Sequence, residues 1–144
     1  MTQLVFSEAR DHFADVFDAA LTHLPTAIVR RRAGVAVLVS ADDLLQIVNG
    51  SRFSPEVFFE PDGGVSIWLP EFAIYGRGST FEEARDDLVT EVREYLAVLA
   101  EDVRLREAPN HRERLPWVAR AMLLDLTEGA LAAALFEDPA SPTG

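Results

Sequence analysis

The chain contains no cysteine and no lysine among its 144 residues. Without cysteine, disulfides, thiol catalysis and the thiolate ligand sets of most structural zinc sites are excluded. No apolar run is long enough to span a bilayer. The first 25 residues have no uninterrupted apolar core, because Glu8, Asp11, Asp15 and Asp18 interrupt them, so they do not resemble a signal peptide. We therefore expect a cytoplasmic protein that does not enter a membrane.

Residue patterns that would indicate an enzyme are also missing. The three histidines, His12, His23 and His111, do not occur at a metal-ligand spacing, and the chain has no GxSxG motif. The segment GRGST at residues 76–80 lacks the spacing and the lysine of a phosphate-binding loop, which favours a strand-to-helix turn. The acidic cluster is expected to be a solvated helix face: Glu82, Glu83, Asp86 and Asp87. We expect no catalytic residue, no bound metal and no cofactor.

Charge is distributed unequally along the chain, whose formal net charge is −11. Residues 1–49 hold four arginines and six acidic residues, a net charge of −2, whereas residues 50–144 hold nine and eighteen, a net charge of −9. A polyanion would be repelled by the second part and could approach only a local cationic patch in the first.

The first part, residues 1–49, is predicted to have the order strand, helix, strand, strand, helix. A strand at residues 4–6 precedes a single helix, capped by Ser7 and ended by Pro25. The apolar positions of that helix form one stripe that we expect to be buried: Ala9, Phe13, Val16, Phe17, Ala20, Leu21 and Leu24. A hairpin of residues 27–31 and 35–40 follows, and Ser40 caps the second helix.

Self-association is expected from this first part. Its hairpin strand at residues 35–39 is apolar on both faces, so both faces should be covered. About 49 residues bury too little surface for comfortable stability alone. We therefore predict a homodimer or a higher even oligomer built through residues 1–49.

The second part, residues 52–136, is predicted to be a three-stranded antiparallel sheet with a packed helix and a C-terminal helix, so the whole chain is of the α+β class. The strands are residues 56–60, 65–69 and 74–77, and the first turn is PDGG. Thr80 and Glu83 form a capping box for the packed helix. We expect a loop at residues 104–114, helices at 116–126 and 129–136, and a frayed tail at 137–144.

Four arginines are the candidates for contact with DNA. In a strand, Arg30 and Arg32 would project to one side and Arg31 to the other. Arg10 lies in the first turn of a helix, where amides and the helix dipole favour a phosphate. The alternative is that these arginines are solvated and paired with Asp11, Asp42 or Asp43.

Four aromatic residues are the candidates for contact with a protein partner: Phe58, Trp68, Tyr75 and Trp117. If Val57 and Phe59 face the packed helix, Phe58 and Trp68 face away from it, because side chains alternate along a strand. Either the C-terminal helix around Trp117 covers that face, or the face binds a partner.

Two family resemblances bear on these candidates. Residues 1–48, with "SEAR" at the helix start and "VRRRAGVAVLVS" in the hairpin, resemble the Phd/YefM antitoxins of type II toxin-antitoxin systems. That resemblance implies a dimeric domain that represses its own operon, with operator contacts from Arg10 and Arg30.

The second resemblance covers residues 54–96. The segments "EPDGG" and "GSTFEEA" are similar to the HicB-type antitoxin domain. This resemblance implies that the acidic second part holds a basic, RNA-cleaving toxin. We thus expect an antitoxin that binds a cognate toxin and operator DNA; the alternative is a protein-interaction module that only dimerises.

Overall fold

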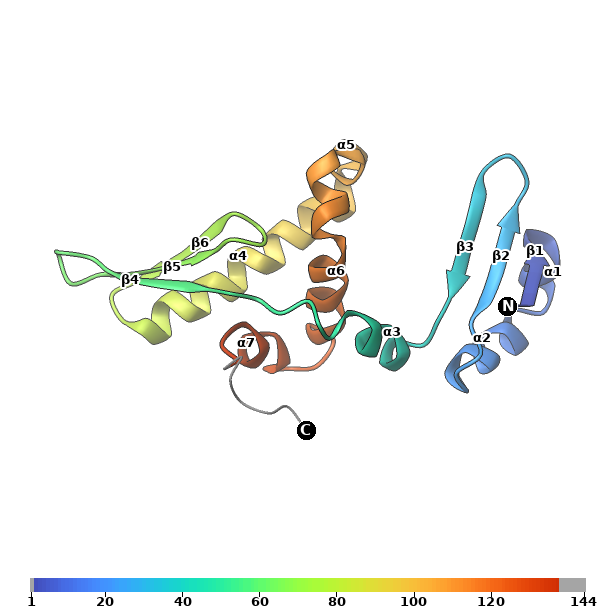
Figure 1. Ribbon diagram of the computed structural model, residues 1–144, viewed down its shortest axis with the longest axis horizontal. Helices are drawn as coiled ribbons and strands as arrows, with labels where there is room; N and C mark the ends of the chain where they lie inside the picture. Colours follow the sequence, from blue (N-terminus) through green and yellow to red (C-terminus); the bar gives the residue numbers. More distant parts are fainter. Residues whose placement is uncertain (1, 138–144) are drawn as a thin grey trace. The chain divides into compact units, whose positions relative to one another are not determined.

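The computed structural model describes residues 2–137 and divides the chain into two compact units, one up to Ile47 and one from Val48 onward. We call them the N-terminal unit and the C-terminal unit. Each contains one three-stranded sheet with helices packed on it (Figure 1), which confirms the predicted α+β class. The predicted tail is outside the described residues from position 138 onward. Among residues 2–137, no helix combines the length and the apolar character needed to cross a bilayer.

The N-terminal unit follows the predicted order of elements. Its elements are β1 (Thr2–Val5), α1 (Phe6–Asp11), α2 (Phe13–Leu21), β2 (Thr26–Arg30), β3 (Gly34–Leu38) and α3 (Ala41–Val48), the last residue of which belongs to the C-terminal unit. The sheet order is β1-β2-β3, with β1 parallel and β3 antiparallel to the central strand. The Ser40 hydroxyl accepts a hydrogen bond of 3.1 Å from the Asp43 amide, which confirms the predicted cap of α3.

The first helix differs from the prediction in two respects. Ser7 is not its cap, because the helix already begins at Phe6, directly after β1. The helix also breaks at His12, whose ψ of 33° is not helical, into α1 and α2. The break is shallow: the His12 amide still donates to the Glu8 carbonyl at 3.0 Å, and its own carbonyl accepts from the Val16 amide at 3.1 Å.

The core of the N-terminal unit is small. Its buried hydrophobic residues are Ala9, Val16, Ala20 and Ala27. The predicted buried stripe was therefore wrong for its largest members, because Phe13, Phe17, Leu21 and Leu24 are exposed in the single chain. Alanines allow the helices to approach the sheet closely, but they remove little apolar surface from water.

The C-terminal unit is built on an antiparallel sheet of order β4-β5-β6. Its strands are β4 (Glu56–Phe59), β5 (Val65–Leu69) and β6 (Ile74–Gly78), as predicted. The helices are α4 (Phe81–Glu101), α5 (Val103–Glu107), α6 (Pro109–Leu124) and α7 (Ala130–Leu135). Helix α4 packs against β5 and β6 (Figure 1), whereas β4 is the edge strand that α4 does not cover.

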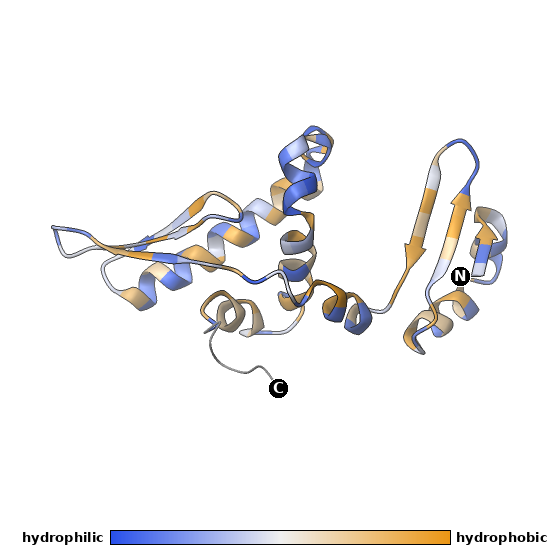
Figure 2. Cartoon of the chain, in the orientation of Figure 1, coloured by the Kyte–Doolittle hydropathy of each residue, from blue (hydrophilic) through white to orange (hydrophobic). Residues whose placement is uncertain are grey.

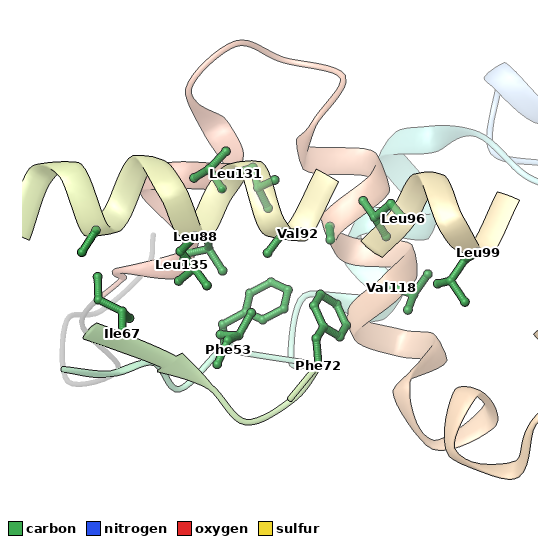
Figure 3. Packing of buried hydrophobic residues seen from close by; sticks show 14 of the residues in the cluster. Phe53, Ile67, Phe72, Leu88, Val92, Leu96, Leu99, Val118, Leu131 and Leu135 are labelled. Carbon is green, nitrogen blue, oxygen red and sulfur yellow. The ribbon is translucent and has the colours of Figure 1, made fainter. Parts of the chain in front are cut away.

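One hydrophobic cluster joins the sheet of the C-terminal unit to its helices (Figure 3). Ile67 of β5 and Phe72 of the following turn meet Leu88 and Val92 of α4, and α6 and α7 add Val118, Leu131 and Leu135. The predicted stripe of α4 is thus confirmed in its buried members Ala84, Leu88, Val92 and Leu99, while Phe81 and Tyr95 are half-buried.

Glycines at positions 76 and 78 permit the close contact between α4 and β6. A Cβ at Gly76 would lie 2.6 Å from the Leu88 amide nitrogen and would also overlap the Ala84 carbonyl oxygen. A Cβ at Gly78 would lie 2.6 Å from the Ala84 amide nitrogen. The segment GRGST thus forms the end of β6 and, at Ser79 and Thr80, the predicted connection to the helix, and its glycines allow the backbones to touch.

The acidic cluster of α4 is not simply a solvated face. Asp87 accepts a hydrogen bond from the Arg77 amide at 2.8 Å, and Glu83 accepts one from the Ser79 amide at 2.8 Å. The Glu83 amide in turn donates to the Thr80 hydroxyl at 3.2 Å, which confirms Thr80 as the cap of the predicted capping box, while the return bond of the Glu83 carboxylate goes to the Ser79 amide instead of the Thr80 amide. Glu82, Glu83 and Asp86 are exposed, as expected of a solvated face, whereas Asp87 is half-buried.

The segment predicted as a loop at residues 104–114 is helical. Most of α5 and the first turns of α6 occupy it, with Pro109 at the start of α6 and Pro116 inside the helix. Proline is favourable at the first helical position. Close to Pro116, the Arg114 side chain donates a hydrogen bond of 3.4 Å to the Tyr95 hydroxyl of α4. The helix predicted to begin at residue 116 therefore begins earlier, at Pro109.

Replacement of Gly76 tests the close contact. Gly76→Ala is expected to lower the free energy of unfolding of the C-terminal unit by about 2 kcal/mol, because the added methyl overpacks α4 against β6. Both tryptophans, Trp68 and Trp117, lie in this unit, so tryptophan fluorescence in urea reports on it alone. Gly50→Ala is the control, since a Cβ there meets nothing within 4 Å. Equal unfolding midpoints for the two variants would contradict the analysis.

Candidate functional site

The N-terminal unit carries an apolar surface flanked by two arginines. Phe6 lies at its centre and contributes to two adjoining hollows. One hollow is lined by Phe6, Ala9, Arg10, Phe13 and Ile28. The other is lined by Phe6, Ile28, Arg30, Ala33, Gly34, Val35 and Ala36. The structure thus brings Arg10 and Arg30, two predicted DNA-contact residues, to the borders of one surface.

Arg30 is positioned by the ring of Phe6. Its guanidinium carbon lies 5.1 Å from the ring centroid, within the range of a cation–π contact. Arg10, by contrast, is exposed and pairs with its neighbour Asp11 at 3.3 Å, a contact that contributes little in water. Phe6 was not among the predicted site residues, although its place directly before the "SEAR" segment could have suggested it.

Arg31 and Arg32 do not extend the strand. They lie with Ala33 in the turn between β2 and β3, where Arg32 has a φ of 64°. The expected alternation of the three arginines, with Arg30 and Arg32 on one side, is therefore wrong, because a turn does not alternate. Figure 2 shows hydrophobic residues along β2 and β3 and hydrophilic residues at the turn that joins them.

The alternative, in which the arginines pair with nearby acidic residues, holds only for Arg10. Among residues 2–137, the charged-group contacts of the N-terminal unit are the Arg10–Asp11 ion pair and a 2.7 Å hydrogen bond between the His23 ring and the Asp43 carboxylate. Arg30, Arg31 and Arg32 do not take part in them, and all three are exposed. Three exposed cationic side chains thus lie at one end of the hairpin.

Large hydrophobic residues remain exposed over the rest of the N-terminal unit. On edge strand β3, Val35 is 65% and Val37 is 47% exposed. The further exposed members are Val5, Phe6, Phe13, Phe17, Leu21, Leu24 and Ile47. A surface of this kind on so small a unit is typical of a face that another protein covers.

In the C-terminal unit, the face of the sheet that α4 does not cover carries aromatic residues. The register pairs Trp68 with Tyr75 and Phe58 with Ser66, so these side chains share that face. The rings of Trp68 and Tyr75 lie 4.5 Å apart, and the Arg77 guanidinium carbon lies 4.8 Å from the Tyr75 ring centroid. We call this group, Phe58, Trp68, Tyr75 and Arg77, the aromatic face.

The aromatic face is open at its edge near β4. A hollow there is lined by Val57, Phe58, Phe59, Glu60, Ser66, Tyr75 and Arg77. Phe58 and Tyr75 are exposed, and α6 packs on α4, which lies against the other face of the sheet. The alternative that the C-terminal helix covers the aromatics was therefore wrong. Arg77 was not predicted, although alternation from Tyr75 places it on the same face.

Trp117, the fourth predicted aromatic residue, lies elsewhere. Its indole Nε1 donates a hydrogen bond of 2.8 Å to the Arg52 carbonyl, and its ring packs on the hydrophobic cluster. Next to it, the Arg120 side chain is buried beneath Phe53, hydrogen-bonded to the Ser51 carbonyl at 3.3 Å and paired with Glu137 at 3.3 Å. Trp117 and Arg120 thus fasten the segment before β4 to α6, and Trp117 contributes nothing to the aromatic face.

Metal binding has no visible basis in the described part of the chain. Across residues 2–137, the acidic and histidine side chains do not gather in groups of three or more that could hold an ion.

Comparison with known proteins identifies relatives in one functional class. Residues 1–134 match the family PHD_like, described as "Antitoxin of toxin-antitoxin, RelE / RelB, TA system". A solved structure from Syntrophomonas wolfei subsp. wolfei, described as the antitoxin part of a candidate toxin/antitoxin system, aligns with a TM-score of 0.75 at 20% sequence identity. The alignment covers 93% of this chain and 96% of that one, so the two share a fold. The curated proteins contain no match.

Proposed function

This chain belongs to the PHD_like family of antitoxins of toxin-antitoxin systems, and we propose that it neutralises a cognate toxin by direct binding and represses its own operon by binding DNA as a dimer. The family match over residues 1–134 is the observation that carries the proposal, because it spans both units. The likenesses of residues 1–48 to Phd/YefM and of residues 54–96 to HicB support a division of these tasks. Residues 1–49 then dimerise and bind DNA, and residues 52–136 bind the toxin.

The DNA-binding surface is proposed to consist of Arg10, Arg30, Arg31 and Arg32. Arg10 and Arg30 border one surface, and the turn residues Arg31 and Arg32 are exposed beside it. Two copies of this patch in a twofold dimer suit a palindromic operator. The net charge of residues 1–49 is only −2, so repulsion of the phosphate backbone is weak there.

The toxin-binding surface is proposed to be the aromatic face. Aromatic and arginine side chains are enriched where protein partners bind tightly, and this face combines both. The net charge of −9 on residues 50–144 favours a basic partner. A cytoplasmic location is proposed, because an operon is transcribed there and both binding activities would act there.

The operator proposal is tested on DNA from upstream of the chain's own gene. Affinity should fall steeply as salt rises, because counterions are released, and Arg30→Ala should weaken binding about tenfold in gel shifts. Arg104→Ala, at an exposed arginine of the C-terminal unit, serves as the control and should bind like the wild type. Unchanged shifts for both Arg10→Ala and Arg30→Ala would count against these contacts and favour a module that only dimerises.

The dimer proposal is tested by sedimentation. We expect a dimer for the wild-type chain and a monomer for Val35→Asp, because the carboxylate would be buried without a partner on an apolar interface. Val103→Asp introduces the same charge at an exposed valine of the C-terminal unit and should remain dimeric. A wild-type chain that stays monomeric at every concentration refutes the proposal.

The toxin proposal is tested by co-expression with the product of the adjacent open reading frame. The wild-type chain should co-purify with that protein and restore growth of cells that express it. Trp68→Ala should weaken the complex about tenfold or more, as expected of a central aromatic contact. Leu115→Ala, at an exposed leucine of α6, is the matched control. Binding and growth unaffected by Trp68→Ala would exclude the aromatic face as the toxin site.

A further inference from the structure

The two edge strands of the C-terminal sheet differ in the hydrogen-bond partners of their outward backbone groups. At edge strand β6, the Arg77 amide donates to the Asp87 carboxylate at 2.8 Å, and just beyond the strand the Ser79 amide donates to Glu83 at 2.8 Å. Side chains of α4 thus occupy one outward backbone donor of that edge, at Arg77, and the amide that follows the strand, at Ser79. Proteins commonly block a sheet edge in such a way, because an open edge pairs with other strands.

At the opposite edge, β4, no other element of residues 2–137 covers the outward backbone groups. The Glu60 amide donates to the Gly64 carbonyl at 2.8 Å, so Glu60 forms a hydrogen-bonded pair with its partner on the β5 side. Such pairs alternate along an antiparallel ladder, and therefore Phe58 also points its amide and carbonyl toward β5. Val57 and Phe59 then point theirs away from the sheet. Among residues 2–137, neither of these two amides has a hydrogen-bond acceptor outside the ladder.

The side chains of β4 are also uncovered on both faces. Phe59 is 79% exposed and Val57 is 37% exposed, although both lie on the face toward α4. Phe58, on the aromatic face, is 46% exposed. The reason is that α4 lies against β5 and β6 and does not reach β4. An added strand would supply hydrogen bonds at the edge and apolar neighbours on both faces.

A second copy of this chain is poorly suited to that edge. If two β4 strands paired about a twofold axis at Phe58, Glu56 of each would lie opposite Glu60 of the other, and like charges in opposite positions destabilise a sheet. A shift of the axis to Val57 or Phe59 brings Pro55 or Pro61 into the ladder, and proline has no amide to donate. The same two glutamates attract a strand with basic residues.

We propose that β4 is a strand-addition site, at which an extended basic segment of the toxin pairs with Val57 and Phe59 as a fourth strand of the sheet. The inference rests on the proposed antitoxin function and specifies how the toxin is held. The outward amides and carbonyls of the two residues give the added strand its hydrogen bonds. Its alternate side chains lie against Phe59 on one face and Phe58 on the other.

Hydrogen exchange in the full-length chain tests the pairing without any mutation. In the free chain, the Val57 and Phe59 amides should exchange rapidly and the Phe58 amide slowly. In the complex with the product of the adjacent open reading frame, protection of Val57 and Phe59 should rise about tenfold or more, because they enter a ladder. Unchanged exchange of both amides in a complex that Trp68→Ala weakens would overturn strand addition and leave the antitoxin function intact.

Two further outcomes of the hydrogen-exchange experiment would also contradict strand addition by the toxin. If the wild-type chain forms no complex with that protein, the proposed function fails, and strand addition fails with it. If the two amides become protected in the free chain as its concentration rises, the edge pairs with a second copy instead, which overturns the assignment to a toxin.

A proline substitution adds an independent test. Val57→Pro removes one outward amide and leaves the ladder between β4 and β5 intact, so the edge strand should tolerate it. It should bind the toxin about tenfold more weakly than Val57→Ala, which keeps the amide. Circular dichroism and urea unfolding establish that both variants are folded. Equal affinities of the two folded variants would refute the pairing.

Discussion

The close contact of α4 with β6 determines how the rest of the C-terminal unit is arranged. Because Gly76 and Gly78 have no side chains, the helix backbone approaches the strand directly. This position brings Asp87 and Glu83 to the outward amides of Arg77 and Ser79, and it places the apolar stripe of α4 over Ile67 and its neighbours. A helix held so close to one edge of a three-stranded sheet cannot also reach the other edge. The exposure of β4 is therefore a consequence of the packing.

The N-terminal unit also leaves apolar surface exposed, but for a different reason. Its helices contact the sheet through alanines and a single valine, so its buried core is small for the number of residues that must be ordered. The phenylalanines of α2 and the valines of β3 remain in contact with water. A partner that covers them would contribute apolar burial that the single chain does not have. The unit is thus incomplete as an isolated fold, and its stability is expected to be coupled to assembly.

The sequence predicted several features that depend on local pattern, although the cap at Ser7 was wrong. The capping residues Ser40 and Thr80, the PDGG turn and the stripe of α4 all lie where period and turn chemistry place them, because these signals act within a few residues. Predictions that needed tertiary information were wrong: the burial of Phe13, the loop at residues 104–114 and the alternation of Arg31 and Arg32. Whether a periodic apolar residue is covered depends on how far the covering element extends. The contact of Arg30 with Phe6 likewise depends on how β1 and β2 pair, which periodicity does not encode.

The unequal distribution of charge favours self-association for one unit and binding of a basic partner for the other. Residues 1–49 carry a net charge of only −2, so two copies can bring their apolar surfaces together at little electrostatic cost, while the exposed arginines stay available to a polyanion. Residues 50–144 carry −9, and the open edge at β4 is bordered by Glu56 and Glu60, so a second copy is repelled there. Apolar surface alone would allow either unit to self-associate. Because like charges oppose it in one unit and not in the other, the proposed self-association is expected through the N-terminal unit, and the proposed basic partner is expected at the C-terminal unit.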